Sequence, residues 1–388
     1  MTPVRRAVVS LCQRDRETPL DFGALMSVSR HAVIVGGSLA GSCAALALSR
    51  HGWQVTIVER SSAELSGGTG ISIDRQLLAS VTGADASILP VVHVGFPATA
   101  WGLLQALLSK ELRQRPGVRV RTGHRVLDVR MEENRNEAVV RTADGDLRAD
   151  LVVGADGYSS IVRRFVAPEH PHAIYGGYLL WRGLITERQV PGGFTEKDIS
   201  FTEHSAGRAR LVTFGVPGSD GGTRPGRRRG SFTWFDPSRT QLLRQSGKLH
   251  GGVVTGTLTG HDASSDTIIE LRHLARGWPS PWRHAIDRAL DRRDFIGTPV
   301  AEYLPPQLVR ESAVLIGDAA HVVSPVTGAG FHNGLLDIQA LTAALHAVPP
   351  ERIQQALNHY QQQRLQPARR LVTQSQQWSR TYVANALG

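Results

Sequence analysis

The sequence predicts an α/β fold, in which a parallel sheet alternates with helices, an antiparallel sheet is inserted, and helices follow at the C-terminal end. Apolar strand-like runs are followed by glycine turns and helix-like segments at three places, near residues 36, 156 and 318. This strand–turn–helix order is typical of a parallel sheet. Between the second and third turns, residues 172–236 form strand-like runs separated by glycine-rich loops, which favours antiparallel pairing.

The first glycine turn follows a β-branched run that starts near Arg30. Apolar sequence stops at Gly36-Gly37 and resumes as an alanine- and leucine-rich helix over residues 39–50. Backbone N–H groups and the positive end of the helix dipole would therefore face a pyrophosphate group. The usual dinucleotide pattern has a second glycine where this chain has Ser38, and an ordinary βαβ unit would share the remaining features.

The next strand, residues 54–58, ends in Glu59. A carboxylate at this point can accept hydrogen bonds from an adenosine ribose. This acidic residue favours a dinucleotide site over an ordinary βαβ unit.

The region between the first and second turns predicts helices and a small β meander. A helix begins near Asp74, and another covers residues 98–115 with its leucines on one face. Gln105 lies in the second helix, where its amide could approach the cofactor or serve as a solvated or helix-capping group. An Asp144-Gly145 hairpin signal accompanies the expected meander strands, which are residues 119–121, 124–131, 137–141 and 147–153.

The antiparallel region carries many aromatic side chains, among them Trp181, Phe214 and Phe235. They suit one wall of an apolar pocket, and ordinary core packing is the alternative for each ring. The strands expected here are residues 175–185, 198–203, 209–214 and 231–235. Helices at 267–276 and 281–291 precede a return to strands at 294–303 and 314–316.

The second and third turns repeat the arrangement of the first. Gly154-Ala155-Asp156-Gly157 follows a buried strand and precedes a helix start. Gly317-Asp318 also follows a strand, and the later Gly328-Ala329-Gly330 opens a helix that continues through residue 341. The remainder, residues 346–388, is helical and rich in arginine.

Composition limits the class of protein. The chain has 388 residues, enough for two joined domains, and no uncharged apolar run reaches the roughly 18 residues of a membrane span. The net charge is +10, and the cations are almost all arginines, because lysine occurs only at Lys110, Lys197 and Lys248. No nucleic-acid recognition motif accompanies these arginines, so a coding bias explains them better than a DNA-binding surface. A local cluster, Arg224 with residues 227–229, could steer an anionic nicotinamide dinucleotide.

The two cysteines, Cys12 and Cys43, allow neither a disulfide framework nor a metal-ligand spacing, so we expect a reducing cytoplasm. Cys43 should be buried in the first helix. Residues 1–29 contain no sustained apolar segment of a secretory signal. We expect a disordered extension there, or a start codon set too early, with Met26 just before the first strand.

The three turns, in this order and at these separations, resemble the cofactor fingerprints of group A FAD-dependent aromatic monooxygenases of the p-hydroxybenzoate hydroxylase type. The resemblance implies a Rossmann-like FAD-binding domain over residues 30–171 and 299–345, an inserted antiparallel-sheet substrate domain over 172–298, and a C-terminal helical segment over 346–388. Several stretches are similar to the 2,6-dihydroxypyridine 3-monooxygenase branch: Gly36-Gly37-Ser38, Gly68-Thr69-Gly70-Ile71, Thr99-Ala100-Trp101 and Tyr178-Leu179-Leu180-Trp181-Arg182-Gly183.

The resemblance also implies roles for individual residues. Asp318 would accept hydrogen bonds from the ribityl hydroxyls of FAD, and Asp156 and Arg163 would organise the groove shared by its pyrophosphate and the nicotinamide dinucleotide. Pro325 and His321 are the expected catalytic residues, although His321 could instead be a packed, hydrogen-bonded histidine. The expected cofactor-binding residues are Gly36, Gly37, Ser38, Leu39, Ala40, Gly41, Glu59, Arg60, Gln105, Asp156, Gly157, Arg163, Gly317, Asp318, Gly328, Ala329, Gly330 and Asn333.

The implied reaction is hydroxylation of an electron-rich aromatic or heteroaromatic small molecule, with FAD as cofactor, NAD(P)H and O2 as co-substrates, and a flavin C4a-hydroperoxide as oxygen donor. His93, Tyr178 and His204 are candidate bases for the substrate hydroxyl, and the sequence does not choose among them. Epoxidation, ring-oxygen insertion and a flavin reductase without oxygen transfer are the enzyme alternatives, and a non-catalytic flavin-binding protein is the alternative from another class. A halogenase is disfavoured because no Trp-x-Trp-x-Ile-Pro segment occurs. We expect no metal, nucleic acid or membrane partner, and a homodimer is the assembly considered.

Overall fold

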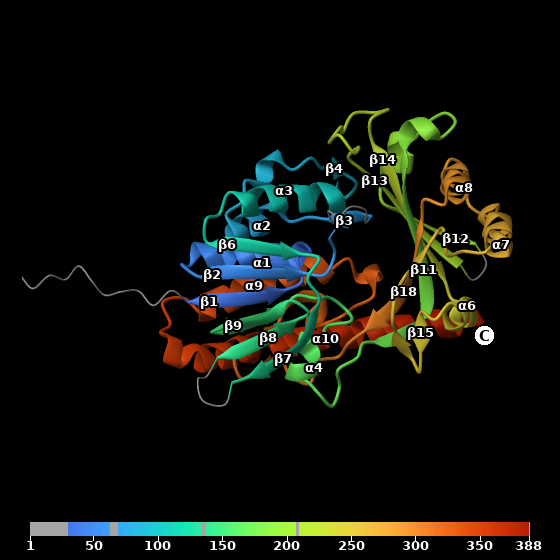
Figure 1. Ribbon diagram of the computed structural model, residues 1–388. Helices are drawn as coiled ribbons and strands as arrows, with labels where there is room; N and C mark the ends of the chain where they lie inside the picture. Colours follow the sequence, from blue (N-terminus) through green and yellow to red (C-terminus); the bar gives the residue numbers. More distant parts are fainter. Residues whose placement is uncertain (1–29, 63–68, 133–136, 207–208, 388) are drawn as a thin grey trace, which may run out of the picture.

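The structure is a computed structural model that describes residues 30–62, 69–132, 137–206 and 209–387. The expectations for the leader, including Cys12 and Met26, lie outside these residues. Two halves make up the described chain, each with its own hydrophobic core, and they lie side by side in Figure 1. None of the helices in the described ranges combines the length and the apolarity that crossing a bilayer requires.

A six-stranded sheet forms the centre of the first half, with strand order β19-β20-β10-β1-β2-β6. All neighbours pair in parallel except the edge strand β19. Valine, isoleucine and leucine in β1 and β10 are almost fully buried, as expected for parallel strands covered on both faces. The strands are β1 (His31–Val35), β2 (Gln54–Glu59), β6 (Val118–Thr122), β10 (Leu151–Gly154), β19 (Val309–Arg310) and β20 (Ala313–Leu315).

Helices cover one face of this sheet, and a small antiparallel sheet, β7-β8-β9, lies against the other (Figure 1). A second three-stranded sheet, β3-β5-β4, lies between the helices and the second half. The short strands are β3 (Gly70–Ser72), β4 (Val92–His93), β5 (Pro97–Ala100), β7 (Val126–Met131), β8 (Ala138–Thr142) and β9 (Gly145–Ala149). The helices are α1 (Leu39–Arg50), α2 (Arg75–Thr82), α3 (Trp101–Arg113), α4 (Val162–Val166) and α9 (Gly330–Ala344).

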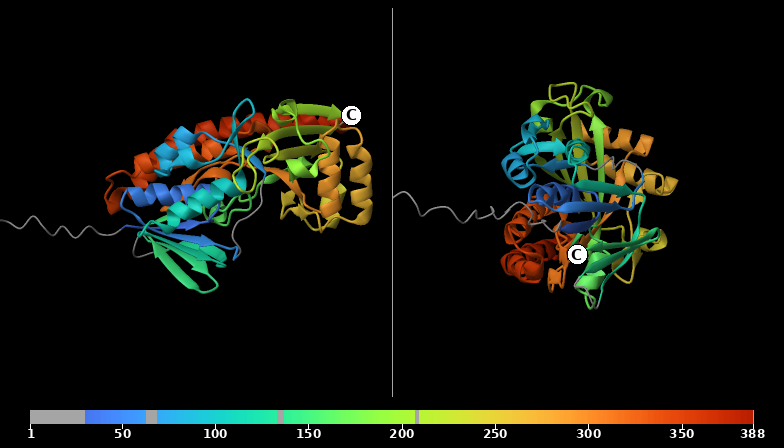
Figure 2. Two further views of the ribbon diagram at one scale, coloured as in Figure 1. Left: turned by 90° about the horizontal axis from the view of Figure 1, so that it is seen from above. Right: turned by 60° about the vertical axis from the view of Figure 1, so that its left-hand side comes forward.

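An eight-stranded antiparallel sheet forms the second half. Its long strand β11 pairs with β14 on one side and with β18 on the other, and α7 and α8 pack together at the far end of the molecule (Figure 2). The strands are β11 (Ile174–Thr186), β12 (Thr202–Ala206), β13 (Ala209–Val216), β14 (Arg229–Asp236), β15 (Leu249–His250), β16 (Val253–Val254), β17 (Leu258–Thr259) and β18 (Ile296–Glu302). The helices are α5 (Glu196–Ile199), α6 (Thr240–Gln245), α7 (Ser265–Ala275) and α8 (Trp282–Arg292).

The last helix, α10 (Ile353–Leu387), runs along both halves (Figure 2). Near its start, Tyr360 Oη donates to the carbonyl of Leu315 in β20 at 2.8 Å. Near its end, Tyr382 Oη donates to the carbonyl of Phe235 in β14 at 3.0 Å. One helix is therefore hydrogen-bonded to a strand of each of the two large sheets.

Two expectations for helices and strands are wrong at their boundaries. The helix expected over 98–115 begins only at Trp101, because residues 97–100 form β5 and pair with β3. The strand expected over 198–203 contains the end of α5 and only the first two residues of β12. Trp101, which directly follows β5, thereby lies at the start of α3.

The expected β meander also needs correction. Residues 119–121 belong to β6 of the six-stranded sheet, and only the later runs form β7-β8-β9. The run 147–153 divides at Asp150, whose carboxylate accepts a hydrogen bond from the backbone N–H of His31 at 2.8 Å. The two parts, β9 and β10, therefore belong to different sheets. The burial of Cys43 in α1 is confirmed.

Candidate functional site

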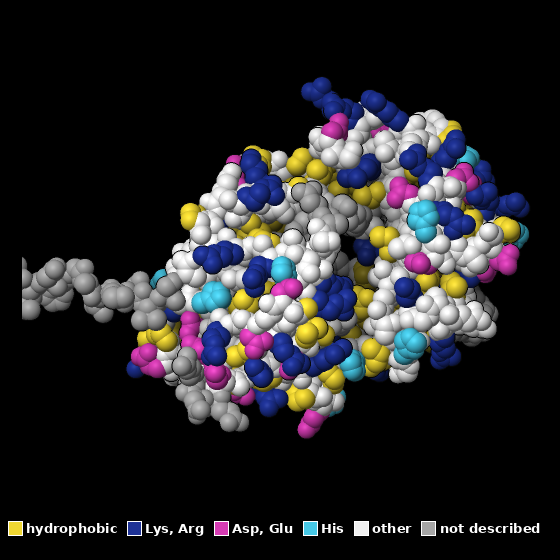
Figure 3. Space-filling model, viewed as in Figure 1, with side chains coloured by type: hydrophobic (Ala, Val, Ile, Leu, Met, Phe, Trp, Pro, Cys, Tyr) yellow, Lys and Arg dark blue, Asp and Glu magenta, His cyan; other side chains and the backbone are white. Residues whose placement is uncertain are grey.

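A cavity of about 1360 Å³ lies between the two halves, and the hollow is visible in Figure 3. Its walls come from the carboxyl ends of β1, β2, β10 and β20, from the start of α9 and from the antiparallel sheet. Ligands bind at such strand ends in open α/β sheets. Pockets for drug-sized molecules measure about 300–1,000 Å³, so this cavity can hold a large cofactor together with a substrate.

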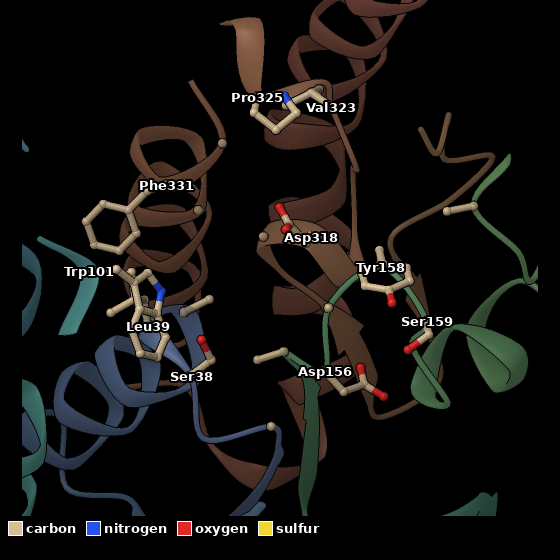
Figure 4. A pocket seen from close by; sticks show the side chains of 18 of the residues that line it. Ser38, Leu39, Trp101, Asp156, Tyr158, Ser159, Asp318, Val323, Pro325 and Phe331 are labelled. Atoms are coloured by element: carbon tan, nitrogen blue, oxygen red, sulfur yellow. The ribbon is translucent and has the colours of Figure 1, made fainter. Parts of the chain in front are cut away.

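The first turn requires glycine for two separate reasons. Gly36 has φ +102°, and a Cβ atom there would lie 2.5 Å from the carbonyl oxygen of Ala155 in the second turn. A Cβ atom on Gly41 would lie 1.9 Å from the carbonyl oxygen of Gly36. The Ser38 side chain makes no capping hydrogen bond to α1 and borders the cavity (Figure 4). The free N–H groups at the start of α1 therefore form an anion-binding end.

Glu59 supports this turn from the end of β2. Its Oε2 accepts from the N–H of Gly37 at 2.7 Å, and its Oε1 accepts from the N–H of Ser61 at 2.8 Å. Each carboxylate oxygen has a further lone pair. Glu59 and Arg60 both line the cavity, so the carboxylate shapes the turn and still borders the space where a ribose would lie.

Arg163 joins the second turn to the third. Its side chain is completely buried, and it donates to the carbonyl oxygens of Ala319 (2.8 Å), Tyr158 (2.8 Å), Asp318 (2.7 Å) and Gly157 (3.3 Å). Its guanidinium also lies 4.1 Å from the ring centre of Tyr303. Arg163 does not line the cavity and therefore positions two turns that do.

The two acidic residues of these turns differ in their partners. Asp156 accepts hydrogen bonds from Ser160 Oγ at 2.5 Å and from the N–H of Ile161 at 2.6 Å. Asp318 points into the cavity in Figure 4, and no side chain or N–H group of the described residues donates to its carboxylate. Surrounding protein raises the pKa of Asp318 by disfavouring its charged form, against the opposing effects of His321 and Arg163. Asp318 thus offers free acceptors to hydroxyl groups of a ligand.

A short segment after the third turn leads into the start of α9. Pro325–Thr327 form a short turn, Gly328 has φ +60°, and α9 begins at Gly330. Pro325, Gly328 and Gly330 line the cavity. The first N–H groups of this 15-residue helix have no helical acceptors, so their dipoles favour negative charge in the cavity.

His321, one of the two expected catalytic residues, does not line the cavity. It is fully buried, and its Nε2 lies 2.6 Å from Oδ2 of Asp337. Asp337 also accepts from the N–H of Gly317 (2.9 Å) and from Arg364 Nε (2.7 Å). Burial alone would lower the pKa of His321, but the charge of Asp337 and the hydrogen bond to it raise this pKa. The ion pair therefore supports the Gly317 turn from behind.

Five other expected cofactor residues do not line the main cavity. Gln105 Nε2 donates to the carbonyl of Gly37 at 3.1 Å, so the amide supports the first turn without lining the cavity. Asn333 Nδ2 donates to the carbonyl of Ala329 at 3.0 Å within α9. Gly37 packs against Glu59 and Gly41 against the carbonyl of Gly36, and Ala329 borders a smaller neighbouring cavity. The expected residues that do line the main cavity are Gly36, Ser38, Leu39, Ala40, Glu59, Arg60, Asp156, Gly157, Gly317, Asp318, Pro325, Gly328 and Gly330.

The antiparallel sheet closes the cavity with apolar side chains. Phe214 of β13 and Phe235 of β14 line it, as expected for a pocket wall. Sequence reasoning missed Tyr158, Arg182 and Phe331 as lining residues. Figure 4 places Trp101 and Phe331 on one side of the cavity and Tyr158 on the other. Phe331 directly follows Gly330, so its position beside a glycine turn is the signal that could have identified it.

None of the three candidate bases lines the main cavity. Tyr178 is fully buried, its hydroxyl lies 2.5 Å from Ser324 Oγ and 3.2 Å from Ser379 Oγ, and burial raises its pKa to about 12. His93 borders the smaller cavity, and burial lowers the pKa of His204.

Two arginines of the expected steering cluster form ion pairs within the protein. Arg228 is buried between Glu187 (3.2 Å) and Glu196 (2.8 Å), and Arg227 pairs with Asp220. These arginines are therefore occupied by internal ion pairs, which weakens the proposed attraction of an anionic dinucleotide.

Comparisons with known proteins agree with a flavin site. Residues 100–174 and 298–375 match a family model described as an FAD binding domain, and residues 175–249 match an FAD binding domain-like model. The chain is 30% identical over 360 residues to a kynurenine 3-monooxygenase of Salinispora arenicola, with 82% of this chain and 72% of that protein covered. It is 25% identical over 339 residues to the 2,6-dihydroxypyridine 3-monooxygenase of Paenarthrobacter nicotinovorans, covering 79% of this chain and 81% of that protein.

The solved structure of 2,6-dihydroxypyridine-3-hydroxylase from Arthrobacter nicotinovorans has the same fold, with a TM-score of 0.74 at 20% identity over 91% of this chain and 92% of that one. The three turns, the free carboxylate of Asp318 and the two helix starts fit the phosphates, ribityl chain and ring of FAD. The chain therefore belongs to the FAD-dependent aromatic monooxygenases of the p-hydroxybenzoate hydroxylase type.

Proposed function

We propose that this protein hydroxylates an electron-rich aromatic or heteroaromatic small molecule, using NAD(P)H and O2. The convergence of Gly36, Asp156 and Asp318 on one cavity carries the proposal, because this cavity continues to an aromatic sheet wall. When bound, FAD would supply hydride acceptance from NAD(P)H and transfer of one oxygen atom from O2 to the substrate.

The residues of the chain would divide the binding of FAD among the three turns. The N–H groups at the start of α1 would hold the pyrophosphate, with Glu59 and Arg60 beside the adenosine ribose. Asp318 would accept hydrogen bonds from the ribityl hydroxyls, for which its carboxylate is free of donors from the described residues. The start of α9 after Gly328 would stabilise negative charge on the reduced ring.

The substrate end of the cavity would exclude water and orient the ring. Phe214, Phe235 and Trp101 provide apolar surface there, and Pro325 borders the same space. A dry pocket protects a reactive oxygen donor from unproductive loss and strengthens electrostatic interactions with the substrate. Because the three candidate bases lie outside the cavity, we infer that the substrate proton leaves through water or through a group on the cavity wall.

The test uses purified FAD-saturated protein, NADH or NADPH, and a panel of hydroxylated heteroaromatic compounds under ¹⁸O2. We expect at least one compound to accelerate NAD(P)H consumption and to gain one ¹⁸O atom, measured by mass spectrometry. Accelerated consumption that yields only hydrogen peroxide with every compound would indicate a reductase. A yellow protein that NAD(P)H does not reduce under any of these conditions would indicate a non-catalytic flavin-binding protein.

A further inference from the structure

Four aromatic rings are packed together between the cavity and the last helix. Phe235 of β14 lines the cavity, and the ring of Tyr178 of β11 is stacked on it, with 5.9 Å between the ring centres and 21° between the ring planes. Tyr178 in turn contacts Trp378 and Tyr382 of α10 edge to face, at 6.0 and 5.2 Å. The rings of Trp378 and Tyr382 are stacked at 5.2 Å, and both residues are only partly buried. The rings therefore form a continuous path from the cavity wall to the surface of the protein.

The buried hydroxyl of Tyr178 is hydrogen-bonded in two directions. Its oxygen lies 2.5 Å from Ser324 Oγ, and Ser324 lines the cavity. On the other side it lies 3.2 Å from Ser379 Oγ, which donates to Glu302 Oε1 at 3.1 Å. Burial raises the pKa of Glu302, against the serine hydrogen bonds and a nearby arginine, and so favours uptake of a proton by this carboxylate. The Tyr178 proton thus has one route toward the cavity and a second route to a buried carboxylate.

The ring path and the hydrogen bonds together suit transfer of single electrons. Loss of one electron turns the hydroxyl of a tyrosine into a strong acid, so tyrosine is oxidised readily only where a neighbouring group can accept its proton. Core packing alone would account for the ring contacts. A buried tyrosine hydroxyl, however, needs only one hydrogen-bond partner, whereas that of Tyr178 has two, and the second leads to a carboxylate.

We propose that Tyr178, Trp378 and Tyr382 carry one-electron oxidising equivalents from the cavity to the surface at α10, and so protect the cavity wall from oxidative damage. This inference rests on the proposed function for the source of the oxidant, a species of the hydroxyl-radical class formed when the oxygen chemistry fails.

Each electron and proton of this transfer is accounted for. The oxidant takes one electron from Tyr178 and one proton through Ser324, which gives water and a neutral phenoxyl radical. Trp378 or Tyr382 then gives an electron to Tyr178 and a proton to solvent, and Tyr178 regains its proton through the hydroxyl of Ser324. A thiol in solution gives a hydrogen atom to the ring on α10, and two of the resulting thiyl radicals join as a disulfide.

Light replaces the oxygen chemistry in the test. FAD-saturated protein is illuminated with blue light in the absence of oxygen, NAD(P)H and substrate, together with a cobalt(III) ammine salt and a nitrone spin trap. Excited FAD takes an electron from a side chain, the cobalt salt removes that electron, and the proton of Tyr178 passes through Ser379 to Glu302. The trap adds to the radicals that it can reach, and peptide mass spectrometry locates the modified residues. Samples kept in the dark and FAD-free protein define the background.

We expect trap adducts at Trp378 or Tyr382 in the illuminated wild type. Tyr178→Phe keeps the ring but removes the oxidisable hydroxyl, so it should reduce these adducts to the background of the dark sample. Tyr175→Phe is the matched control and should behave as the wild type. Tyr175 lies on the same strand, its hydroxyl is within 3.4 Å of a threonine hydroxyl, and it belongs to none of the ring contacts of the described residues.

Trp101 provides an internal reference. It also lines the cavity, but no ring contact of the described residues joins it to the path toward α10. Adducts at Trp101 should increase in Tyr178→Phe, because the radicals can no longer leave the cavity along the path. The double variant Trp378→Phe with Tyr382→Phe should cause the same increase. It changes only partly buried positions and serves as the second variant in case Tyr178→Phe does not fold.

Four results would overturn the inference: no adducts on α10 in the illuminated wild type, unchanged adducts there in Tyr178→Phe, the same loss in Tyr175→Phe, or unchanged adducts at Trp101 in the double variant. The assay requires neither NAD(P)H nor oxygen, so it is independent of the proposed reaction. Adducts on α10 without ¹⁸O transfer to any compound would refute only that reaction. Transfer of ¹⁸O without these adducts would refute only this inference.

Discussion

Replacing Arg163 by methionine should weaken both the fold and the binding of FAD. Methionine occupies a similar volume but cannot donate to the four carbonyl groups of the second and third turns. One of these bonds, to Ala319, is fully buried, and the other three are partly buried. An unsatisfied buried acceptor costs about 1–3 kcal/mol.

The buried carbonyl would cost about 2 kcal/mol and each of the three others about half of that. Removing the guanidinium also removes the cost of burying its charge, so the free energy of unfolding should fall by a net amount of about 3–4 kcal/mol. For a chain of this size the midpoint of thermal unfolding should fall by about 4–5 °C. The dissociation constant of FAD should rise at least about tenfold, because Gly157 and Asp318 lose their common anchor.

The assay has two readouts: thermal unfolding of the FAD-free protein by circular dichroism, and titration of that protein with FAD by flavin fluorescence. Arg163→Lys is the matched control, since it keeps the charge but has one donor group instead of a fork, and it should lie between the wild type and Arg163→Met. Wild-type values for both readouts in Arg163→Met would refute the idea that this side chain joins the two turns.

Three further substitutions give independent checks. Gly36→Ala should reduce FAD affinity at least about tenfold, because the added Cβ meets the second turn. The control Gly95→Ala has φ +103° but nothing within 4 Å of the added Cβ, so it should share only the backbone strain and bind FAD normally. Equal FAD binding in both variants would contradict the steric argument. Asp318→Asn should weaken FAD binding about tenfold while leaving the unfolding temperature of the FAD-free protein unchanged, and a large change in that temperature would show an internal structural role instead. Because Asp337 raises the pKa of His321, the free energy of unfolding should decline as the pH rises from about 6.5 toward the raised pKa. Urea unfolding across this pH range measures the decline, and the variant His321→Gln should abolish it. An identical pH profile in the variant would exclude this ion pair as the cause.

The turns could be predicted from sequence because each combines its signals within a few residues: an apolar strand, a glycine and an acidic side chain. The direction in which an individual side chain points could not be predicted from sequence. Asp318 and His321 are close in the chain, but Asp318 borders the cavity while His321 turns back to Asp337. The difference depends on the short turn Gly317–Ala319 and on an acidic partner in α9.

Long-range partners also explain what sequence reasoning missed about Arg163 and Arg182. Arg163 donates to a carbonyl 156 positions later in the chain, so no local pattern shows that it joins two turns. Arg182 lines the cavity and donates to Thr69, 113 positions earlier in the chain, so its placement depends on the folded surroundings. In the same way, residues 98–100 form a strand because β3 lies beside them, although the sequence itself also suits a helix.

The C-terminal helix has a consequence for how the molecule denatures. Helix α10 is hydrogen-bonded to Leu315 in one half and to Phe235 in the other, so unfolding of either core would remove hydrogen-bond partners from the same helix. The two halves should consequently lose their structure together, as a single calorimetric peak whose van't Hoff and measured enthalpies agree. Cutting the chain just before α10 should break this concerted behaviour and leave each core to melt at its own, lower temperature.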